Sequence, residues 1–199
     1  MSPEITAALV KRHTHELRNC LNGVEMSLTL LDETHDETQR RETIRKIRQE
    51  MRSAEAMIRF FSGRFSSENK SQFLAADMIE QWMVDARSLL PETPITWDVL
   101  VGESVLEIEA SLLRSVLGEL TLLSARKGYS PSLGISCRVA NGTLDITIAS
   151  SRTSAETHPG DESEQALRTW LKDFALRNGG ALEWSKGDIK LTLRSVAAS

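Results

Sequence analysis

The sequence is poor in cysteine: Cys20 and Cys137 are the two cysteines among 199 residues, and they lie far apart. With no Cys-x-x-Cys pair and no cysteine–histidine cluster, neither a disulfide framework nor a structural zinc site is expected. No apolar run approaches the roughly 20 residues that span a bilayer. Residues 1–5 lack the basic and apolar regions of a signal peptide. The sequence therefore predicts a cytoplasmic protein that makes no use of a membrane.

The chain also has no excess of positive charge, because its 24 Lys and Arg are outnumbered by 28 Asp and Glu, for a net charge of −4. A protein whose main partner is the nucleic-acid backbone usually carries a basic excess, so no nucleic-acid partner is expected. The chain does have 40% hydrophobic residues, which is enough for a hydrophobic core without disulfide or metal cross-links.

The first third of the chain has the periodicity of two long helices. Along the first helix, apolar-face residues recur at intervals of three and four: Leu9, His13, Leu17, Cys20, Val24, Leu28 and Leu31, with Leu21 widening the face. The second helix carries a heptad seam: Ile44, Ile47, Met51, Ala54, Ile58, Phe61 and Phe65. Ser2 is the expected cap of the first helix, and Thr34 with Glu37 has capping-box spacing for the second.

Two such helices joined by a short loop predict an antiparallel hairpin. One hairpin cannot cover both apolar faces, whereas two copies can bury them in a four-helix bundle around a two-fold axis. The sequence therefore predicts a homodimer. The alternative is that the hairpin packs on the rest of its own chain.

The polar run at 66–71 marks a boundary between a helical domain at 1–66 and a second domain at 72–199. The second domain is expected to contain helices at 75–90, 110–126 and 163–177, a strand at 95–101 and hairpins at 133–148 and 182–193. Asn141-Gly142 suits the turn of the first hairpin, and Gly179-Gly180 suits a helix C-cap. Helices on one face of a mostly antiparallel sheet define an α+β sandwich.

The first helix carries the candidate chemistry. At about 100° per residue, His15 projects roughly 160° from Leu17, away from the apolar face, whereas His13 falls on the apolar side. An exposed neutral imidazole has a ring nitrogen that can accept a phosphoryl group. The alternative for a lone exposed histidine is a plain surface residue, and that is the expectation for His35 and His158.

Polar residues surround His15 on the same side of the predicted helix. Arg12, Asn19 and Asn22 fall within about 60° of it. Glu16 could orient the ring or take a proton from it, and Arg12 and Arg18 could steady a charged phosphoryl group.

The run His15-Glu16-Leu17-Arg18-Asn19-Cys20-Leu21-Asn22 resembles the H-box of dimeric sensor histidine kinases, with Cys20 where that family usually has proline. The resemblance implies that His15 is the phosphoacceptor, that Glu16 assists transfer and that Asn19 supports dephosphorylation of receiver domains. The order of predicted elements after residue 72 is similar to the ATP-binding domain of the same family.

Three features of that ATP-binding domain are missing. Glu119 and Leu123 stand where the family has asparagines that hold magnesium and nucleotide, and a leucine offers no oxygen ligand. The adenine-recognising Asp-x-Gly is replaced by Ala149-Ser150-Ser151-Arg152. The Gly-x-Gly phosphate loop is absent before the third helix of this domain, which begins near Glu162-Ser163-Glu164-Gln165. No bound nucleotide or metal is therefore expected.

A kinase-like chain that keeps its acceptor histidine without an ATP site resembles ChpT-type histidine phosphotransferases. The resemblance implies a homodimer that passes phosphoryl groups through His15 between receiver domains, including that of a hybrid histidine kinase, with Mg²⁺ supplied by the receiver. Basic residues on the second helix could guide an acidic receiver surface: Arg40, Arg41, Arg45, Lys46, Arg48 and Arg52. The alternatives are an ATP-dependent histidine kinase with a divergent pocket and a non-catalytic scaffold or receiver phosphatase.

Overall fold

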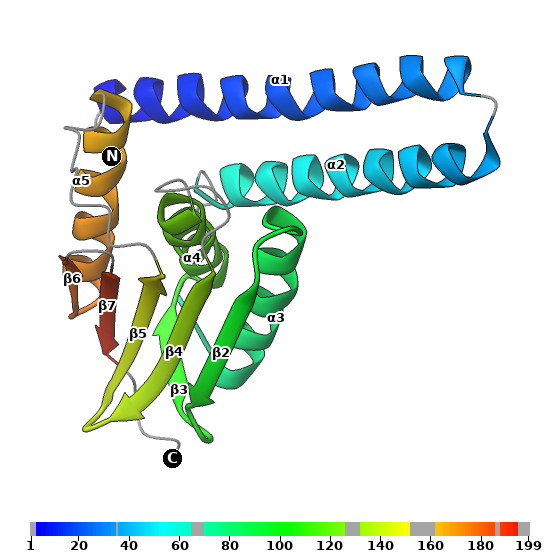
Figure 1. Cartoon of the computed structure of the whole chain (residues 1–199). Coiled ribbons are helices and arrows are strands. Elements are labelled where there is room, and N and C mark those ends of the chain that lie inside the picture. The colour runs from blue at the N-terminus through cyan, green and yellow to red at the C-terminus, as the bar shows by residue number, and fades with distance from the viewer. Residues whose placement is uncertain are drawn as a thin grey trace.

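The computed structural model describes residues 3–34, 36–64, 70–125, 132–151, 162–185 and 188–194. Two long helices, α1 (Pro3–Glu33) and α2 (Glu37–Arg64), form the predicted antiparallel hairpin, and part of it projects as an arm from an α/β domain (Figure 1). None of the helices in these ranges combines the length and apolar character that a membrane crossing requires.

The start of α2 differs from the prediction. Asp36 caps the helix, because its Oδ1 accepts a hydrogen bond from the Gln39 backbone N–H at 2.8 Å. The Thr34 hydroxyl donates instead to the Leu30 carbonyl at 2.6 Å. The expected Thr34–Glu37 capping box is therefore wrong, since Thr34 directly follows α1 and its hydroxyl bonds back to that helix. The cap expected at Ser2 lies outside the described residues.

The α/β domain follows the predicted order of elements, with two additional short strands. Its elements are β1 (Ser71–Leu74), α3 (Ala75–Leu89), β2 (Ile95–Leu100), β3 (Val105–Ile108), α4 (Ala110–Ala125), β4 (Leu133–Ala140), β5 (Thr143–Ser150), α5 (Glu162–Arg177), β6 (Ala181–Trp184) and β7 (Asp188–Arg194). The unpredicted strands β1 and β3 pair with each other in a separate antiparallel sheet. Neither strand alternates strictly between polar and apolar residues, which is the pattern that predicted the hairpin strands.

The main sheet has the strand order β2-β4-β5-β7-β6. Strand β2 runs parallel to β4, and every other neighbouring pair is antiparallel. The β4–β5 turn has the positive φ angles of a two-residue hairpin loop, 52° at Asn141 and 73° at Gly142. Gly179, with φ 68°, ends α5 as predicted, and the following Gly180 N–H donates to the Ala175 carbonyl at 2.9 Å.

One face of the sheet is covered by α3, α4 and α5, and the core lies between these two layers. Trp82 of α3 is fully buried there; its indole N–H donates to the Thr121 hydroxyl of α4 at 2.9 Å, and its ring meets Trp97 of β2 edge to face at 5.0 Å. The predicted α+β class is confirmed.

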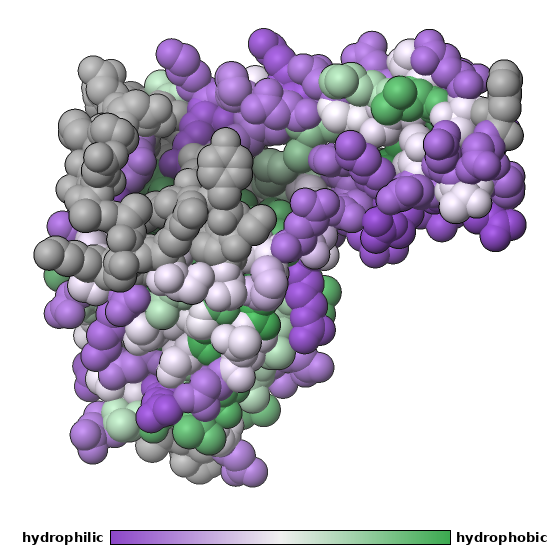
Figure 2. Space-filling view, viewed as in Figure 1, coloured by the Kyte–Doolittle hydropathy of each residue, from purple (hydrophilic) through white to green (hydrophobic). Residues whose placement is uncertain are grey.

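The hairpin packs on its own α/β domain over the half nearest to that domain. Ser53 of α2 donates to the Ser88 carbonyl of α3 at 2.8 Å. Asp85 of α3, which is buried, holds Arg114 of α4 through two hydrogen bonds and lies 3.7 Å from Arg59 of α2. The other half of the hairpin projects beyond the domain, and Figure 2 shows apolar side chains among polar ones at its far end.

Candidate functional site

His15 lies on the exposed surface of α1, so its predicted outward orientation is confirmed. The Asn19 side-chain amide lies 3.3 Å from its ring Nδ1, one helical turn further along. Asn19 and Asn22, which were predicted to share this face, are both exposed. The same face continues along the arm to Met26 and Leu30, which are 68% and 52% exposed.

On the opposite side of α1, four ionisable side chains meet between α1 and α4. They are hereafter called the Glu119 cluster: Arg12, His13, Glu16 and Glu119. Glu119 of α4 is 1% exposed, and its carboxylate lies 3.2 Å from His13 Nε2 and 3.7 Å from Arg12. Glu16 lies 3.3 Å from Arg12 Nε and 3.7 Å from His13 Nδ1. Within this cluster, the Arg12 guanidinium and the His13 ring each contact both carboxylates, and the arginine charge offsets part of the cost of burying them.

Two predicted site residues thus differ in position from what the sequence suggested. Arg12 was expected beside His15, but it is 7% exposed and its guanidinium reaches Glu119. Its long stem carries the charge around the helix toward a buried carboxylate, which attracts it more strongly than solvent does. Glu16 also directs its carboxylate into the Glu119 cluster rather than to the solvent side of α1. Arg18 is exposed as expected.

Sequence reasoning missed the partners of Glu119. A single glutamate within the Leu-rich stretch of α4 is the available signal, because a buried carboxylate requires a cation or hydrogen-bond donors. The neighbouring His13 on the apolar face of α1 is the complementary signal. Each residue was considered separately, and nothing in the spacing of either helix shows that α1 and α4 meet.

At the two α4 positions where the resemblance implies asparagines, the chain has a buried glutamate and a buried leucine. Glu119 is engaged by α1, and Leu123 is 3% exposed and has no oxygen ligand. Among the described residues, no three His, Cys, Asp or Glu side chains come together as metal ligands. Ala149 and Ser150 form the end of β5, whereas Arg152 and the segment that precedes α5 lie outside the described residues.

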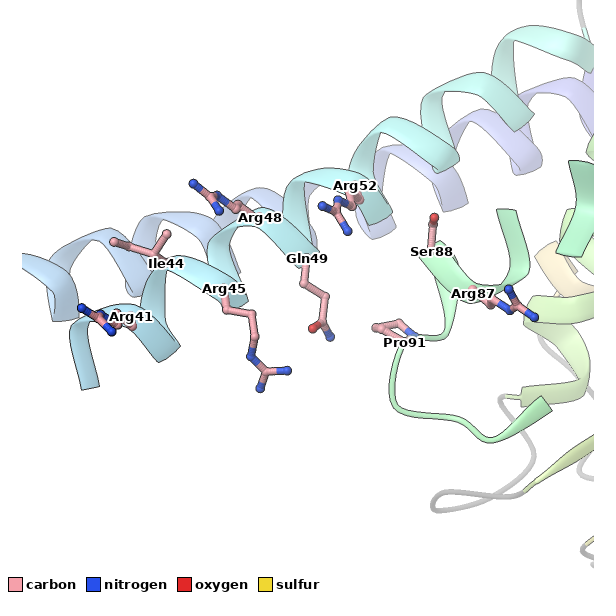
Figure 3. A pocket seen from close by; sticks show the side chains of 9 residues that line it. All are labelled: Arg41, Ile44, Arg45, Arg48, Gln49, Arg52, Arg87, Ser88 and Pro91. Atoms are coloured by element: carbon pink, nitrogen blue, oxygen red, sulfur yellow. The ribbon is translucent and has the colours of Figure 1, made fainter. Parts of the chain in front are cut away.

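Four of the basic residues predicted to guide a partner line a groove of about 710 Å³ between α2 and the end of α3: Arg41, Arg45, Arg48 and Arg52. Arg87, Ser88 and Pro91 complete its other side. Figure 3 shows the guanidinium groups fanning out around the groove, whereas Gln49 points toward Pro91. Arg41 pairs with Glu37 at 3.0 Å. The groove is therefore a basic surface rather than a closed pocket with converging ligands.

The two cysteines differ in their surroundings. Cys20 is half-buried on α1, where burial and the nearby Glu50 raise its pKa above the ordinary value. Cys137 is buried within β4, and burial raises its pKa to about 12. Neither thiol is activated as a nucleophile, because activation requires a lowered pKa.

Comparison with known proteins identifies the fold. No protein-family model and no curated protein sequence matches the chain. Among known structures, one described as a bacterial phosphotransferase superposes over 98% of both chains with a TM-score of 0.62 and 16% identity. A histidine kinase from Burkholderia phymatum STM815 superposes over 100% of both chains with a TM-score of 0.55 and 14% identity. The Acinetobacter baumannii histidine kinase AdeS covers 92% of this chain and 96% of its own, with a TM-score of 0.51 and 14% identity.

At these identities the likeness establishes architecture. The chain has the histidine kinase-like fold, a helical hairpin followed by an ATPase-like α/β domain. Its match to the bacterial phosphotransferase extends over nearly the full length of both chains, hairpin and α/β domain together.

Proposed function

We propose that this protein is a histidine phosphotransferase of the ChpT type, which accepts a phosphoryl group on His15 from one receiver domain and passes it to another. The exposure of His15 on the face of α1 opposite the Glu119 cluster is the observation that carries the proposal. The α/β domain packs against the other side of the helix, and the His15 ring is on the exposed side, where a partner protein could reach it.

In the proposed reaction, a lone pair on the His15 ring attacks the phosphorus of a receiver aspartyl phosphate. The new N–P bond forms as the P–O bond to the aspartate breaks, and the electron pair of that bond leaves with the carboxylate. The aspartyl phosphate is already an activated donor, so this step requires no nucleotide. Mg²⁺ in the receiver's own acidic site offsets the phosphoryl charge.

The proposed absence of ATP binding rests on the residues of α4. A nucleotide with Mg²⁺ needs oxygen ligands that are free to turn toward it. Glu119 is instead committed to Arg12 and His13, and Leu123 has no oxygen. These contacts favour a phosphotransferase over the alternative of an ATP-dependent kinase.

Two surfaces support a receiver as the partner. Met26 and Leu30 extend from His15 along one exposed face of α1, which offers apolar area next to the reactive ring. The arginines of the α2 groove give an otherwise acidic chain a local positive field, which favours approach of an acidic protein. Arg18, Asn19 and Asn22 are exposed on α1 and are candidate polar contacts.

The decisive experiment incubates the full chain with a receiver domain that carries a radiolabelled aspartyl phosphate. We expect label to appear on the wild-type chain and then on a second, unlabelled receiver. His15→Ala should abolish both events, because it removes the proposed attacking nitrogen. His158→Ala, which removes a different histidine, should leave transfer unchanged.

Two outcomes would contradict the proposal. Label on His15 after incubation with radiolabelled ATP alone would establish a kinase instead. Receiver dephosphorylation that is equally fast with wild type and His15→Ala, with no label on this chain, would establish a scaffold or phosphatase.

A further inference from the structure

We infer that Glu119 is a positioning residue for phosphoryl transfer: from the α/β domain it holds the part of α1 that carries His15, and thereby aligns the ring with a docked receiver. The inference rests on the proposed function and gives the α/β domain a task in the same reaction. It is carried by the contacts and the burial of the Glu119 cluster.

The first observation is how α1 is held near His15. Of the α1 side chains whose exposure the structure describes, three are buried: Arg12, His13 and Ser27. Arg12 and His13 precede His15 by three and two residues, and both of them contact Glu119 of α4. The helical turn that leads into His15 is therefore anchored to the α/β domain by polar side chains.

The second observation is that Glu119 contacts two consecutive positions of α1. Its carboxylate lies 3.7 Å from the Arg12 guanidinium and 3.2 Å from His13 Nε2. Consecutive residues project about 100° apart around a helix, so a carboxylate that contacts both of them restricts rotation of α1 about its axis. Because His15 follows His13 on the same helix, these contacts also determine the direction in which its side chain projects.

Burial makes this anchor difficult to replace. Glu119, His13 and Arg12 are only 1%, 5% and 7% exposed. A buried carboxylate that lost its arginine would remain an uncompensated charge, so α1 cannot move away from Glu119 without a large cost. Apolar packing is non-directional by comparison and tolerates small shifts. A buried polar anchor therefore defines the position of the helix more narrowly.

The proposed reaction depends on such a definition, because the attacking nitrogen must approach phosphorus in line with the bond that breaks. Met26 and Leu30, the exposed apolar residues proposed to contact the receiver, lie about three and four turns beyond His15 on α1. A receiver seated on them meets the ring correctly only if the helix before His15 keeps its direction. A displacement of about 1 Å can slow such a reaction on the order of 100-fold.

The test measures the rate constant for transfer from a labelled receiver to the full chain, over a range of receiver concentrations. At saturation, Glu119→Ala should lower this rate constant about ten- to a hundredfold. The receiver concentration that gives half of the maximal rate should change by less than about twofold, because the docking surface is not altered. Glu119→Gln keeps the side-chain length and one oxygen but not the charge, so a loss of about three- to tenfold is expected.

Asp85 provides the matched control. It is also 1% exposed, and its described ion pairs are with Arg59 of α2 and Arg114 of α4, not with α1. Asp85→Ala and Asp85→Asn therefore remove an equally buried carboxylate without releasing the turn before His15. Both variants should be destabilised like their Glu119 counterparts, and both should keep the wild-type rate constant for transfer in the folded protein.

A small phosphoryl donor separates alignment from the reactivity of the ring. Phosphoramidate transfers its phosphoryl group to a histidine nitrogen as its own P–N bond breaks, and ammonia leaves with the electron pair of that bond. This donor needs no docking surface. Labelling of His15 by phosphoramidate, located by mass spectrometry, should therefore proceed equally fast in wild type, Glu119→Ala and Asp85→Ala.

The outcomes distinguish this inference from the proposed function. A folded Glu119→Ala protein, or Glu119→Gln if the alanine variant does not fold, that takes label from the receiver at the wild-type rate would overturn the positioning role. Equal losses in the Glu119 and Asp85 variants would do the same, as would an equal slowing with phosphoramidate, while His15-dependent transfer still stood. Labelling that survives His15→Ala would overturn the proposed function itself, and this inference with it.

Discussion

At the scale of single residues, burial gives the two cysteines different reactivity. The raised pKa of Cys137, about 12, means that its thiolate is strongly disfavoured in the folded protein. Because the folded-state pKa lies above the ordinary value of 9.0, this thiol stabilises the fold below about pH 9, and that contribution is lost as the pH rises toward 12. Cys20 is only half-buried and lies on the accessible hairpin.

We therefore predict that a thiol reagent at pH 8 modifies Cys20 slowly and Cys137 only after denaturation. Mass spectrometry of the labelled chain would count the modified thiols over time. Cys20→Ser should eliminate the reaction of the native protein, and denaturant should then release one thiol. Equal rates of modification at both cysteines would contradict the burial of Cys137.

Residue positions were predictable from the sequence where a helix period alone decides them. The outward orientation of His15 followed from its angle to Leu17, because that angle depends only on helix geometry. Arg12 did not follow, although its Cα lies near the same face. Its position is set by a carboxylate more than 100 residues further along the chain, and no local pattern contains that information.

At the scale of secondary-structure elements, the Glu119 cluster joins α1 to α4. Removing one member of a buried ionic cluster leaves its partners without a counter-charge. Such a change typically lowers the free energy of unfolding by about 3–5 kcal/mol. Glu119→Ala should therefore lower the free energy of unfolding by about that amount and loosen the N-terminal part of α1. Urea unfolding measures the first effect, and hydrogen exchange of the α1 amides measures the second.

Glu103→Ala is the matched control, because Glu103 is an exposed glutamate in the turn between β2 and β3. Surface changes of this kind usually alter stability by no more than about 0.5 kcal/mol. If Glu119→Ala is no more costly than Glu103→Ala, the cluster does not hold α1 in place.

Elements with a clear period or a hairpin turn were predictable, and strands β1 and β3 were not. Helices α3, α4 and α5 carry several apolar turns each, and the β4–β5 hairpin has alternation with an Asn-Gly turn. Strands β1 and β3 depend on each other rather than on a pattern of their own, since each pairs only with the other. The predicted cap of α2 was two residues too early, because Thr34 and Asp36 are both residue types that cap helices. The Thr34 hydroxyl is used at the end of α1, and Asp36 caps α2.

At the scale of the whole molecule, the helical hairpin leaves apolar side chains exposed on both helices, on the projecting arm and, at Ile58, in the half nearest the α/β domain. Leu21 and Leu28 on α1 are 54% and 48% exposed, and Met51 and Ile58 on α2 are 58% and 50% exposed. In each pair the residues are seven apart, so each pair follows one face of its helix. This pattern supports the predicted homodimer, in which two arms would form a four-helix bundle.

We expect the protein to sediment as a dimer at micromolar concentration, and Leu28→Glu combined with Met51→Glu to convert it to a monomer, because two charges per chain would then enter the interface. Met26→Glu is the control. Met26 is at least as exposed, but it lies about 20° from His15 and roughly opposite Leu28, so the dimer should persist. A wild-type monomer in sedimentation equilibrium would refute the bundle.

The sequence left open whether the hairpin packs on a second copy or on the rest of its own chain. The half of the hairpin nearest the α/β domain packs on its own chain through Ser53 and Arg59, and the far half does not. The heptad seam looks the same throughout α2, because apolar periodicity records that a face is buried and not what buries it.

The Glu119 cluster also bears on how such a chain can change. Glu119 contacts the Arg12 guanidinium and the His13 ring at the α4 position where the resemblance implies an asparagine. A lone change of Glu119 to asparagine would leave the buried Arg12 with less counter-charge, and a change of Arg12 first would leave the buried carboxylate without its cation. An amide ligand at this position would therefore require coordinated changes on two distant segments of the chain.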